Sequence, residues 1–213
     1  MEMASTLGYK REETFVQKMV GNKAFWILFW AFLFAYPIYR SYNRELPPEL
    51  PVQFNLPSYS LTNEFGTEFG SKDLDGKVYL VTFTRTECDS ICEGNMKQLQ
   101  KIQKRMKGVR KESAMVSITL DAGKDTPESL NKFARALDAN PFFWNFLSAD
   151  KAKVDKLLSD GFRIKELDDS YLGKLFLVDR RNRVRGLYKT DKDSINKLMI
   201  DVGLLINRDQ LYK

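Results

Sequence analysis

The chain has 213 residues, with 34 Lys and Arg against 28 Asp and Glu, and it contains two cysteines and no histidine. Its length fits one domain plus an appendage, and its 43% hydrophobic content excludes a disordered chain. Without histidine the chain cannot build a Ser-His-Asp or Cys-His site, a His-ligated zinc site or a haem on imidazole. Two cysteines allow one dithiol or disulfide. The net charge of +6 alone does not indicate nucleic acid, and we expect no nucleic-acid partner.

An apolar segment lies near the N-terminus, where residues 24–39 (AFWILFWAFLFAYPIY) carry no charged side chain. At about 1.5 Å per residue this segment spans roughly 24 Å, and the residues from Met19 to Gly21 can extend it toward the ~30 Å of a bilayer core. A buried core helix would carry a polar face, and a cleaved signal peptide would end in small residues. The segment has neither feature. We therefore predict an uncleaved, single-pass membrane anchor.

The basic residues around this segment predict its orientation. Four bases precede the segment and two follow it: Lys10, Arg11, Lys18 and Lys23, then Arg40 and Arg44. This excess predicts a cytoplasmic N-terminus and an exported C-terminal part, where disulfides can form. We divide the chain into a cytoplasmic tail (1–23), a transmembrane anchor (24–40), a linker rich in proline (41–53) and a domain (54–213).

Strand and helix patterns alternate along residues 54–213. Apolar, β-rich runs predict buried strands at 77–84 and 114–121, and hairpins are expected at 54–66, with a turn near Asn63, and at 174–189. Helical spacing predicts helices at 89–107, from Asp125 onward, at 148–160 and at 191–206. This order predicts an α/β domain of three layers with a mixed sheet.

Cys88 and Cys92 are four positions apart, directly after the first buried strand and at the start of the next helix. In the first turns of a helix, residues at i and i+4 lie on one face, so the two sulfurs can meet. The positive end of the helix dipole stabilises a thiolate there. These properties suit disulfide exchange and Cu(I) binding by soft sulfur ligands. The alternatives are a structural disulfide or two inert thiols.

Residues 83–92 (FTRTECDSIC) resemble the F-x-x-T-x-C-x-x-x-C signature of the SCO/SenC family. Residues 117–121 (SITLD), followed by Asp125-Thr126-Pro127, are similar to the family's S-x-D-P-x-x-D-T-P stretch. The resemblance implies a thioredoxin-like fold and a role in assembling the binuclear copper centre of cytochrome c oxidase. An N-terminal anchor is typical of the family. The implied location is a bacterial inner membrane with the domain in the periplasm, and the implied partner is a respiratory oxidase subunit or a thiol-redox protein.

The sequence departs from this family at the third copper ligand. The family binds copper through its two cysteines and a histidine in the loop before the late hairpin, and here that loop reads ELDDSY (166–171). Matching Asp168 to the family's aspartate places Asp169 at the histidine position, whereas counting back from Phe176 places Tyr171 there. We therefore expect Cys88 and Cys92 to bind Cu(I) with two sulfurs only, or not at all. Cu(II), which favours nitrogen and oxygen donors, should bind badly.

Three functions remain open on these observations. The first is a membrane-anchored SCO-like protein whose Cys-x-x-x-Cys dithiol acts in thiol-disulfide exchange, in copper-site assembly for a respiratory oxidase, or in both. In this case the chain would be a thiol-disulfide oxidoreductase if it is an enzyme. The second is a Cu(I) metallochaperone with two cysteine ligands. The third is a non-catalytic docking domain whose cysteines form a structural disulfide.

Other polar and aromatic residues have simpler interpretations. Asp125 is expected to cap a helix and Asp121 to end a strand, rather than to form an acid-base pair. The bases between Lys97 and Lys111 predict a solvated helix face, with an anionic lipid or an acidic partner as the alternative. Four arginines around the late hairpin turn are expected to face solvent, with docking of an acidic partner as the alternative: Arg180, Arg181, Arg183 and Arg185. Trp144, which lies beside Phe142 and Phe143 in the sequence, is expected to pack in the core.

Overall fold

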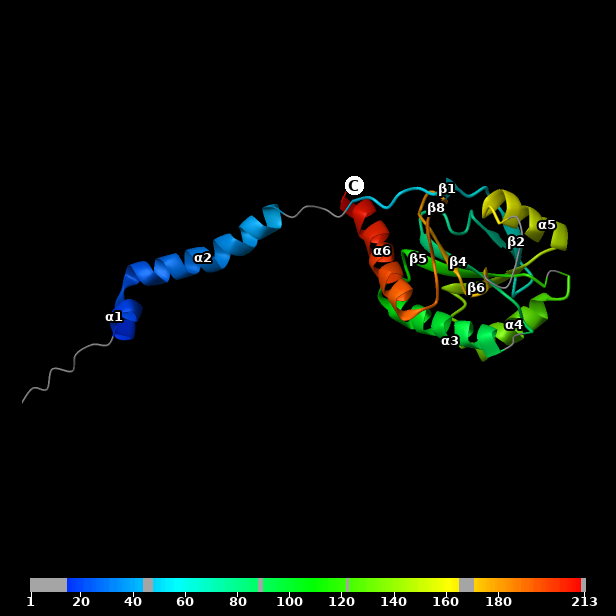
Figure 1. The fold of residues 1–213 in the computed structure, drawn as a ribbon, viewed down its shortest axis with the longest axis horizontal. Helices are drawn as coiled ribbons and strands as arrows, with labels where there is room; N and C mark the ends of the chain where they lie inside the picture. Colours follow the sequence, from blue (N-terminus) through cyan, green and yellow to red (C-terminus); the bar gives the residue numbers. More distant parts are fainter. Residues whose placement is uncertain (1–14, 44–47, 88–89, 122, 165–170, 212–213) are drawn as a thin grey trace, which may run out of the picture. The chain divides into compact units, whose positions relative to one another are not determined.

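The structure is a computed structural model that describes residues 15–43, 48–87, 90–121, 123–164 and 171–211. The chain forms two units, Met1–Pro48 and Glu49–Lys213. The first contains α1 (Phe15–Gly21) and α2 (Lys23–Tyr42) (Figure 1). The side chain of Asn22 caps α2 by accepting a 2.9 Å hydrogen bond from the backbone N–H of Ala24.

Helix α2 confirms the predicted apolar helix near the N-terminus. Its 20 residues are predominantly apolar, and none of them is buried in the structure. By length and composition it is able to cross a membrane.

The second unit contains one eight-stranded sheet in the order β1-β8-β7-β4-β5-β6-β2-β3. Strand β4 is parallel to β5, and β5 to β6, while the other pairs are antiparallel, so the predicted mixed sheet is confirmed. The strands are β1 (Phe54–Asn55), β2 (Ser60–Asn63), β3 (Glu68–Gly70), β4 (Val78–Thr84), β5 (Ser113–Thr119), β6 (Trp144–Ser148), β7 (Leu175–Val178) and β8 (Arg183–Tyr188). The helices are α3 (Ser90–Arg105), continued by a 3₁₀ turn (Met106–Val109), α4 (Pro127–Ala136), α5 (Lys151–Lys156), continued by a π-helical turn (Leu157–Gly161), and α6 (Lys192–Leu211).

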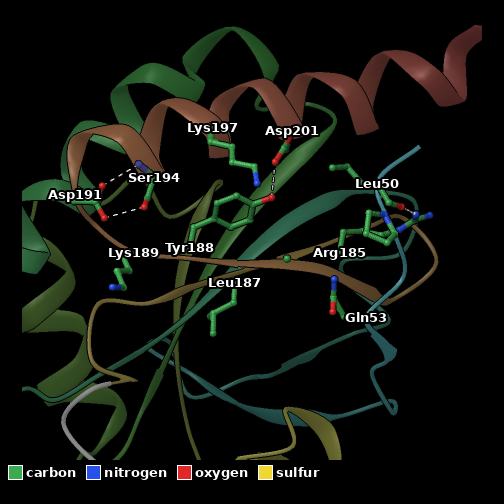
Figure 2. A pocket seen from close by; sticks show the side chains of 12 residues that line it. Leu50, Gln53, Arg185, Leu187, Tyr188, Lys189, Asp191, Ser194, Lys197 and Asp201 are labelled. Atoms are coloured by element: carbon green, nitrogen blue, oxygen red, sulfur yellow. Dashed lines mark hydrogen bonds between the residues drawn. The ribbon is translucent and has the colours of Figure 1, made fainter. Parts of the chain in front are cut away.

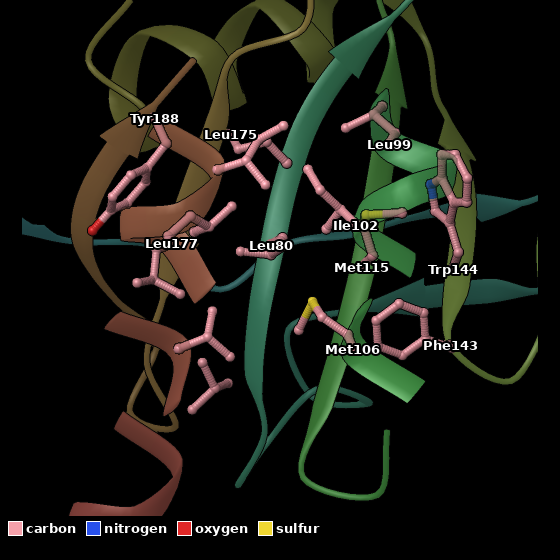
Figure 3. Close-up of a cluster of buried hydrophobic side chains, with 14 of the residues drawn as sticks. Leu80, Leu99, Ile102, Met106, Met115, Phe143, Trp144, Leu175, Leu177 and Tyr188 are labelled. Atoms are coloured by element: carbon pink, nitrogen blue, oxygen red, sulfur yellow. The ribbon is translucent and has the colours of Figure 1, made fainter. Parts of the chain in front are cut away.

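The sheet is buried on both faces, which confirms the predicted three layers. Along β4, Val78 and Leu80 belong to a core with α3, α4 and α6. The alternate residues Tyr79, Val81 and Phe83 belong to a second core on the other face, with α5. Figure 3 shows the first core, in which Leu80 and Met115 of the central strands meet side chains of α3. The period of two along the strand places successive side chains on opposite faces.

The sheet is curled, as the connection between β1 and β2 requires. These strands occupy the first and seventh places in the sheet, yet only residues 56–59 join them. Five steps along an extended chain span at most about 18 Å, whereas six strand spacings in a flat sheet would be about 29 Å. The twist of the sheet must therefore bring its two ends toward one another.

Two predicted elements need correction. Residues 144–148 form the strand β6, and the following helix begins at Lys151 rather than at 148. The predicted hairpin at 54–66 is shifted, because Phe54–Asn55 pairs with β8 while β2 and β3 form the hairpin. Its turn lies at Asn63 as predicted, where the side-chain oxygen of Asn63 accepts 3.0 Å hydrogen bonds from the N–H groups of Phe65 and Thr67.

One prediction about side-chain burial is confirmed and one needs correction. Trp144 is fully buried as predicted, and its indole donates a 2.9 Å hydrogen bond to Ser117 Oγ; of its two neighbours, Phe143 is buried and Phe142 is 93% exposed. Arg185 was expected to face solvent, and it is only 4% exposed because its guanidinium bonds the buried carboxylate of Asp179. A buried arginine requires such a partner.

Glu64 lies in the turn between β2 and β3, and its burial should make the stability of the domain depend on pH. It is 3% exposed, and its Oε2 accepts a 2.9 Å hydrogen bond from the backbone N–H of Phe146. Burial raises the pKa of Glu64 above its usual value. The fold therefore favours the protonated acid, and this stabilisation is lost as the pH rises through the unfolded and then the folded pKa.

Glu64→Gln keeps the acceptor for Phe146 but cannot ionise. The free energy of unfolding of Glu64→Gln minus that of the wild type should therefore be larger at about pH 7 than at about pH 4. Glu64→Ala leaves the N–H of Phe146 without its partner and should cost about 1–3 kcal/mol at both pH values. Urea unfolding at the two pH values measures both effects. A difference between Glu64→Gln and wild type that does not change with pH would contradict this interpretation.

Candidate functional site

The candidate site lies where β4 ends and α3 begins. Strand β4 ends at Thr84, and the backbone of Cys92 lies in the first turn of α3. Cys88 lies outside the described residues, and so does the side chain of Cys92. Within the described parts of the chain, no three His, Cys, Asp or Glu residues form a group that could hold a metal ion. The thiol geometry at Cys88 and Cys92 therefore stays a prediction.

A buried carboxylate, Asp125, lies beside the segment that leads to Cys88. It is 8% exposed, and its two carboxylate oxygens accept hydrogen bonds from the hydroxyls of Thr86 and Thr119. Thr86 precedes Cys88 by two positions, and Thr119 is the last residue of β5. We call Asp125, Thr86 and Thr119 the Asp125 cluster. These hydrogen bonds connect the segment that leads to Cys88 with the carboxyl end of β5.

Asp125 is not the cap of α4, contrary to the sequence-based expectation. Thr126 is the N-cap, and its Oγ1 accepts a 3.2 Å hydrogen bond from the N–H of Ser129. Asp125 binds the two threonine hydroxyls instead, and a buried carboxylate requires such donors. Asp121 was expected to end the strand, but β5 ends two residues earlier, at Thr119; Oδ1 of Asp121 lies 4.0 Å from Nε of Arg85. Both side chains of this ion pair are partly exposed, so its contribution to stability is small.

The loop with the family's histidine position ends close to β4 and α3. Residues 165–170, including Asp169, lie outside the described residues. Leu172 pairs with Phe83 of β4 in a parallel bridge, and its carbonyl accepts a 3.3 Å hydrogen bond from Nδ2 of Asn95 in α3. Gly173 has φ +77°, and a Cβ there would lie 2.4 Å from Cγ of Asn95. This exit from the loop therefore depends on glycine and is fixed beside the two elements that flank Cys88.

Tyr171, the other candidate for the histidine position, is held by packing contacts. Its ring packs against the core that contains Phe83, and Nζ of Lys174 lies 4.2 Å from the ring centroid. A cation over an aromatic ring at this distance is an attractive contact. The ring of Tyr171 thus contributes to the packing of the second core.

A cavity of about 530 Å³ lies elsewhere, along β8 and α6 and beside Leu50 and Gln53 (Figure 2). Within it the hydroxyl of Tyr188 donates a 2.6 Å hydrogen bond to Oδ2 of Asp201, and burial raises the pKa of Tyr188. The residues lining it do not include any described residue of the β4–α3 junction. The cavity is therefore separate from the candidate site.

The outer face of α3 and its 3₁₀ turn is basic, as predicted. Its exposed bases are Lys97, Lys101, Lys104, Arg105 and Lys107. Nη1 of Arg105 donates a 3.0 Å hydrogen bond to the side chain of Asn196 in α6. The exposure agrees with the solvated face expected from the sequence.

A mixed sheet with helices on both faces and a cysteine motif between β4 and α3 defines a thioredoxin-like protein. Residues 51–202 match the family model described as SCO1/SenC. The chain therefore belongs to the SCO1/SenC family, and the resemblance seen in its sequence is confirmed.

The relatives of the chain agree with this family. A protein described as an SCO1 protein homolog from Bacillus subtilis (strain 168) is 24% identical over 114 residues, which cover 53% of this chain and 59% of that protein. The match thus spans less than two thirds of that relative's length. A SCO1/SenC family lipoprotein from Bacillus anthracis has a similar structure, with a TM-score of 0.65 and 25% identity over 73% of this chain and 96% of that chain.

Two further solved structures share the fold. BsSco, described as a member of the Sco family of cytochrome c oxidase assembly proteins, gives a TM-score of 0.66 at 20% identity, covering 75% of this chain and 98% of its own. ScoI from Bradyrhizobium japonicum, solved with copper bound, gives a TM-score of 0.56 at 20% identity, covering 68% of this chain and 98% of its own.

Proposed function

We propose that this chain is a membrane-anchored Sco protein that acts through Cys88 and Cys92, in thiol-disulfide exchange, in copper-site assembly for a respiratory oxidase, or in both. The observation that carries this proposal is a Cys-x-x-x-Cys motif at the β4–α3 junction of a chain that belongs to the SCO1/SenC family. Two relatives add support: BsSco is described with a disulfide switch, and ScoI was solved with copper bound. The partner would be an oxidase subunit or a thiol-redox protein.

In thiol-disulfide exchange, the thiolate of Cys88 attacks one sulfur of a partner's disulfide and releases the partner's other sulfur as a thiolate. Cys92 then attacks the Cys88 sulfur of this mixed disulfide and releases the partner's second thiol. The partner gains two electrons and two protons, and the Cys88–Cys92 disulfide forms. We assign the first attack to Cys88 because it precedes the N-terminus of α3, where the helix dipole stabilises a thiolate, whereas Cys92 lies inside the helix.

In copper-site assembly, copper is cargo that the protein receives and passes on. Two thiolates suit Cu(I), which prefers soft sulfur ligands. The chain has no histidine, so an imidazole ligand is absent from its sequence. Asp169 or Tyr171 at the family's histidine position offers only a hard oxygen donor. The donor set therefore favours Cu(I) over Cu(II).

Helix α2 would anchor this protein in a bacterial inner membrane, with the N-terminus in the cytoplasm and the domain in the periplasm. The supporting observations are the length and apolarity of α2 and the excess of basic residues before it. In this arrangement residues 1–23 form the tail, 24–40 the anchor, 41–53 the linker and 54–213 the domain. Cysteine-accessibility labelling of intact cells and of inverted membranes would test the orientation.

The function can be tested with the reduced full chain in detergent, titrated with Cu(I) against a competing chelator. We expect one Cu(I) per chain, and we expect its binding to be lost in Cys88→Ser and in Cys92→Ser because each removes a soft ligand. Ser90→Ala is the matched control, since it changes the same helical turn without removing a sulfur. Equal Cu(I) binding in all four proteins would overturn the copper part of the proposal.

The same preparation separates exchange from a structural disulfide. A dithiol that equilibrates with a glutathione buffer supports exchange. A disulfide with a potential below about −300 mV would instead favour a docking domain with a permanent crosslink.

A further inference from the structure

We infer that Asp125 is a positioning residue for the dithiol, and that it acts by holding Thr86 in place. This inference rests on the proposed function, because it concerns how the Cys88–Cys92 pair is presented. It assigns to a buried carboxylate a role other than helix capping. The supporting contacts are those of the Asp125 cluster.

The chain leaves the sheet just before this cluster. The carbonyl of Thr84 accepts a 2.9 Å hydrogen bond from the N–H of Leu120, at the end of the β4–β5 ladder. Thr86 lies two positions beyond β4 and two positions before Cys88. Its hydroxyl bonds to Asp125, whose backbone lies in the segment between β5 and α4. The path from the sheet to Cys88 is therefore tethered after its regular pairing ends.

Asp125 is itself held in place by two further hydrogen bonds. The second oxygen of Asp125 accepts a hydrogen bond from Thr119 at the end of β5, and the backbone N–H of Asp125 donates to the carbonyl of Asp121 at 3.1 Å. Both of these contacts are local to the β5–α4 segment, whereas Thr86 is 39 positions away in sequence. Because hydrogen bonds to a buried carboxylate are stronger than neutral ones, the Thr86 contact is the part that fixes the approach to Cys88.

Holding Thr86 in place favours formation of the Cys88–Cys92 disulfide. Two thiols on a fixed backbone meet at a higher effective concentration than two thiols on a loose one. In a glutathione buffer, the dithiol and one glutathione disulfide give the Cys88–Cys92 disulfide and two glutathione thiols. Loosening Thr86 should lower the equilibrium constant of this reaction and make the potential of the pair less negative.

The test measures this equilibrium constant in the full chain in detergent. Thr86→Val should lower it at least about tenfold, which corresponds to about 30 mV for a two-electron couple. Thr86→Ser keeps the hydroxyl and should behave as wild type. Thr82→Val is the matched control, since Thr82 lies in β4, is fully buried, and its hydroxyl has no hydrogen-bond partner among the described residues.

A double-mutant cycle shows whether Thr86 acts through Asp125. In an Asp125→Ala background, Thr86→Val should cause no further change, because the contact that it removes is already absent. Additive effects, or a Thr86→Val constant within about twofold of wild type, overturn the inference. If the wild-type dithiol does not equilibrate with glutathione at all, the proposal of thiol-disulfide exchange is contradicted. If it does equilibrate and Thr86→Val changes nothing, only the proposed role of Asp125 is contradicted. Circular dichroism confirms that each variant is folded.

Discussion

Replacing Asp179 by alanine should lower the free energy of unfolding by about 3–5 kcal/mol, because the buried Arg185 loses its buried carboxylate partner and keeps only the exposed Glu49. Asp179 is 5% exposed, and its Oδ2 lies 2.7 Å from Nε of Arg185 and 2.8 Å from Nε of Arg183. Its Oδ1 accepts hydrogen bonds from the backbone N–H groups of Arg181 and Arg183. One carboxylate thus neutralises a buried guanidinium and also holds the turn between β7 and β8.

Arg185 also joins this turn to the start of the domain. Its guanidinium donates to the carbonyl of Leu50 and to Oε1 of Glu49, the latter at 3.2 Å. Chemical unfolding followed by circular dichroism measures the loss in Asp179→Ala. The matched control is Arg181→Ala, which removes an exposed base from the same turn and should change stability by less than about 0.5 kcal/mol. A loss below about 1 kcal/mol in Asp179→Ala would show that Arg185 does not depend on this carboxylate.

Introducing histidine at position 169 should restore Cu(II) binding. Asp169→His adds an imidazole to the two sulfurs, and we expect Cu(II) affinity to rise at least about a hundredfold, or about 2.7 kcal/mol. Tyr171→His should give no such gain, because the ring of Tyr171 packs against the second core and Lys174. Competition with a Cu(II) chelator, together with visible absorption from a Cu(II)–thiolate bond, measures the effect.

Asp168→His is the control for this experiment, since it places an imidazole one position away. A gain in Tyr171→His without one in Asp169→His would instead assign the histidine position to residue 171. A gain in none of the three variants would indicate that this loop does not reach the two sulfurs.

The sequence predicted the central strands well because their patterns are strong. Residues of β4 and β5 are mostly apolar, with only small polar side chains among them, and every residue of both strands is buried, as expected for central strands covered on both faces. Strand β6 was missed because a short run such as Trp144–Ser148 has no distinct periodicity next to a helical pattern. Its identity as a strand depends on pairing with β5, which no local pattern contains.

The misassigned polar residues have a similar explanation. Asp125 and Thr126 are both good N-cap residues, so local propensity cannot choose between them. The choice depends on Thr86, which lies far away in the sequence. Arg185 lies at the register shift of the β7–β8 pair, between Val184 and Gly186, and its buried partner Asp179 belongs to the turn before β8, so the contact depends on how the two strands pair. The cysteine motif itself was evident from spacing and resemblance, whereas the contacts that hold its approach required the three-dimensional structure.

The placement of β1 also restricts the order in which the domain can fold. Phe54 pairs with Val184, 130 positions later, and β2 pairs with β6. The hairpin of β2 and β3 can form locally, but its pairing with β6 and the pairing of β1 with β8 must wait for most of the chain, and such long-range pairing is slow. During synthesis, β1 and the edge of β2 that pairs with β6 would therefore remain unpaired until β8 and β6 are made. Folding of this domain should thus be completed late, and β1 and the free edge of β2 are the parts that stay unpaired longest.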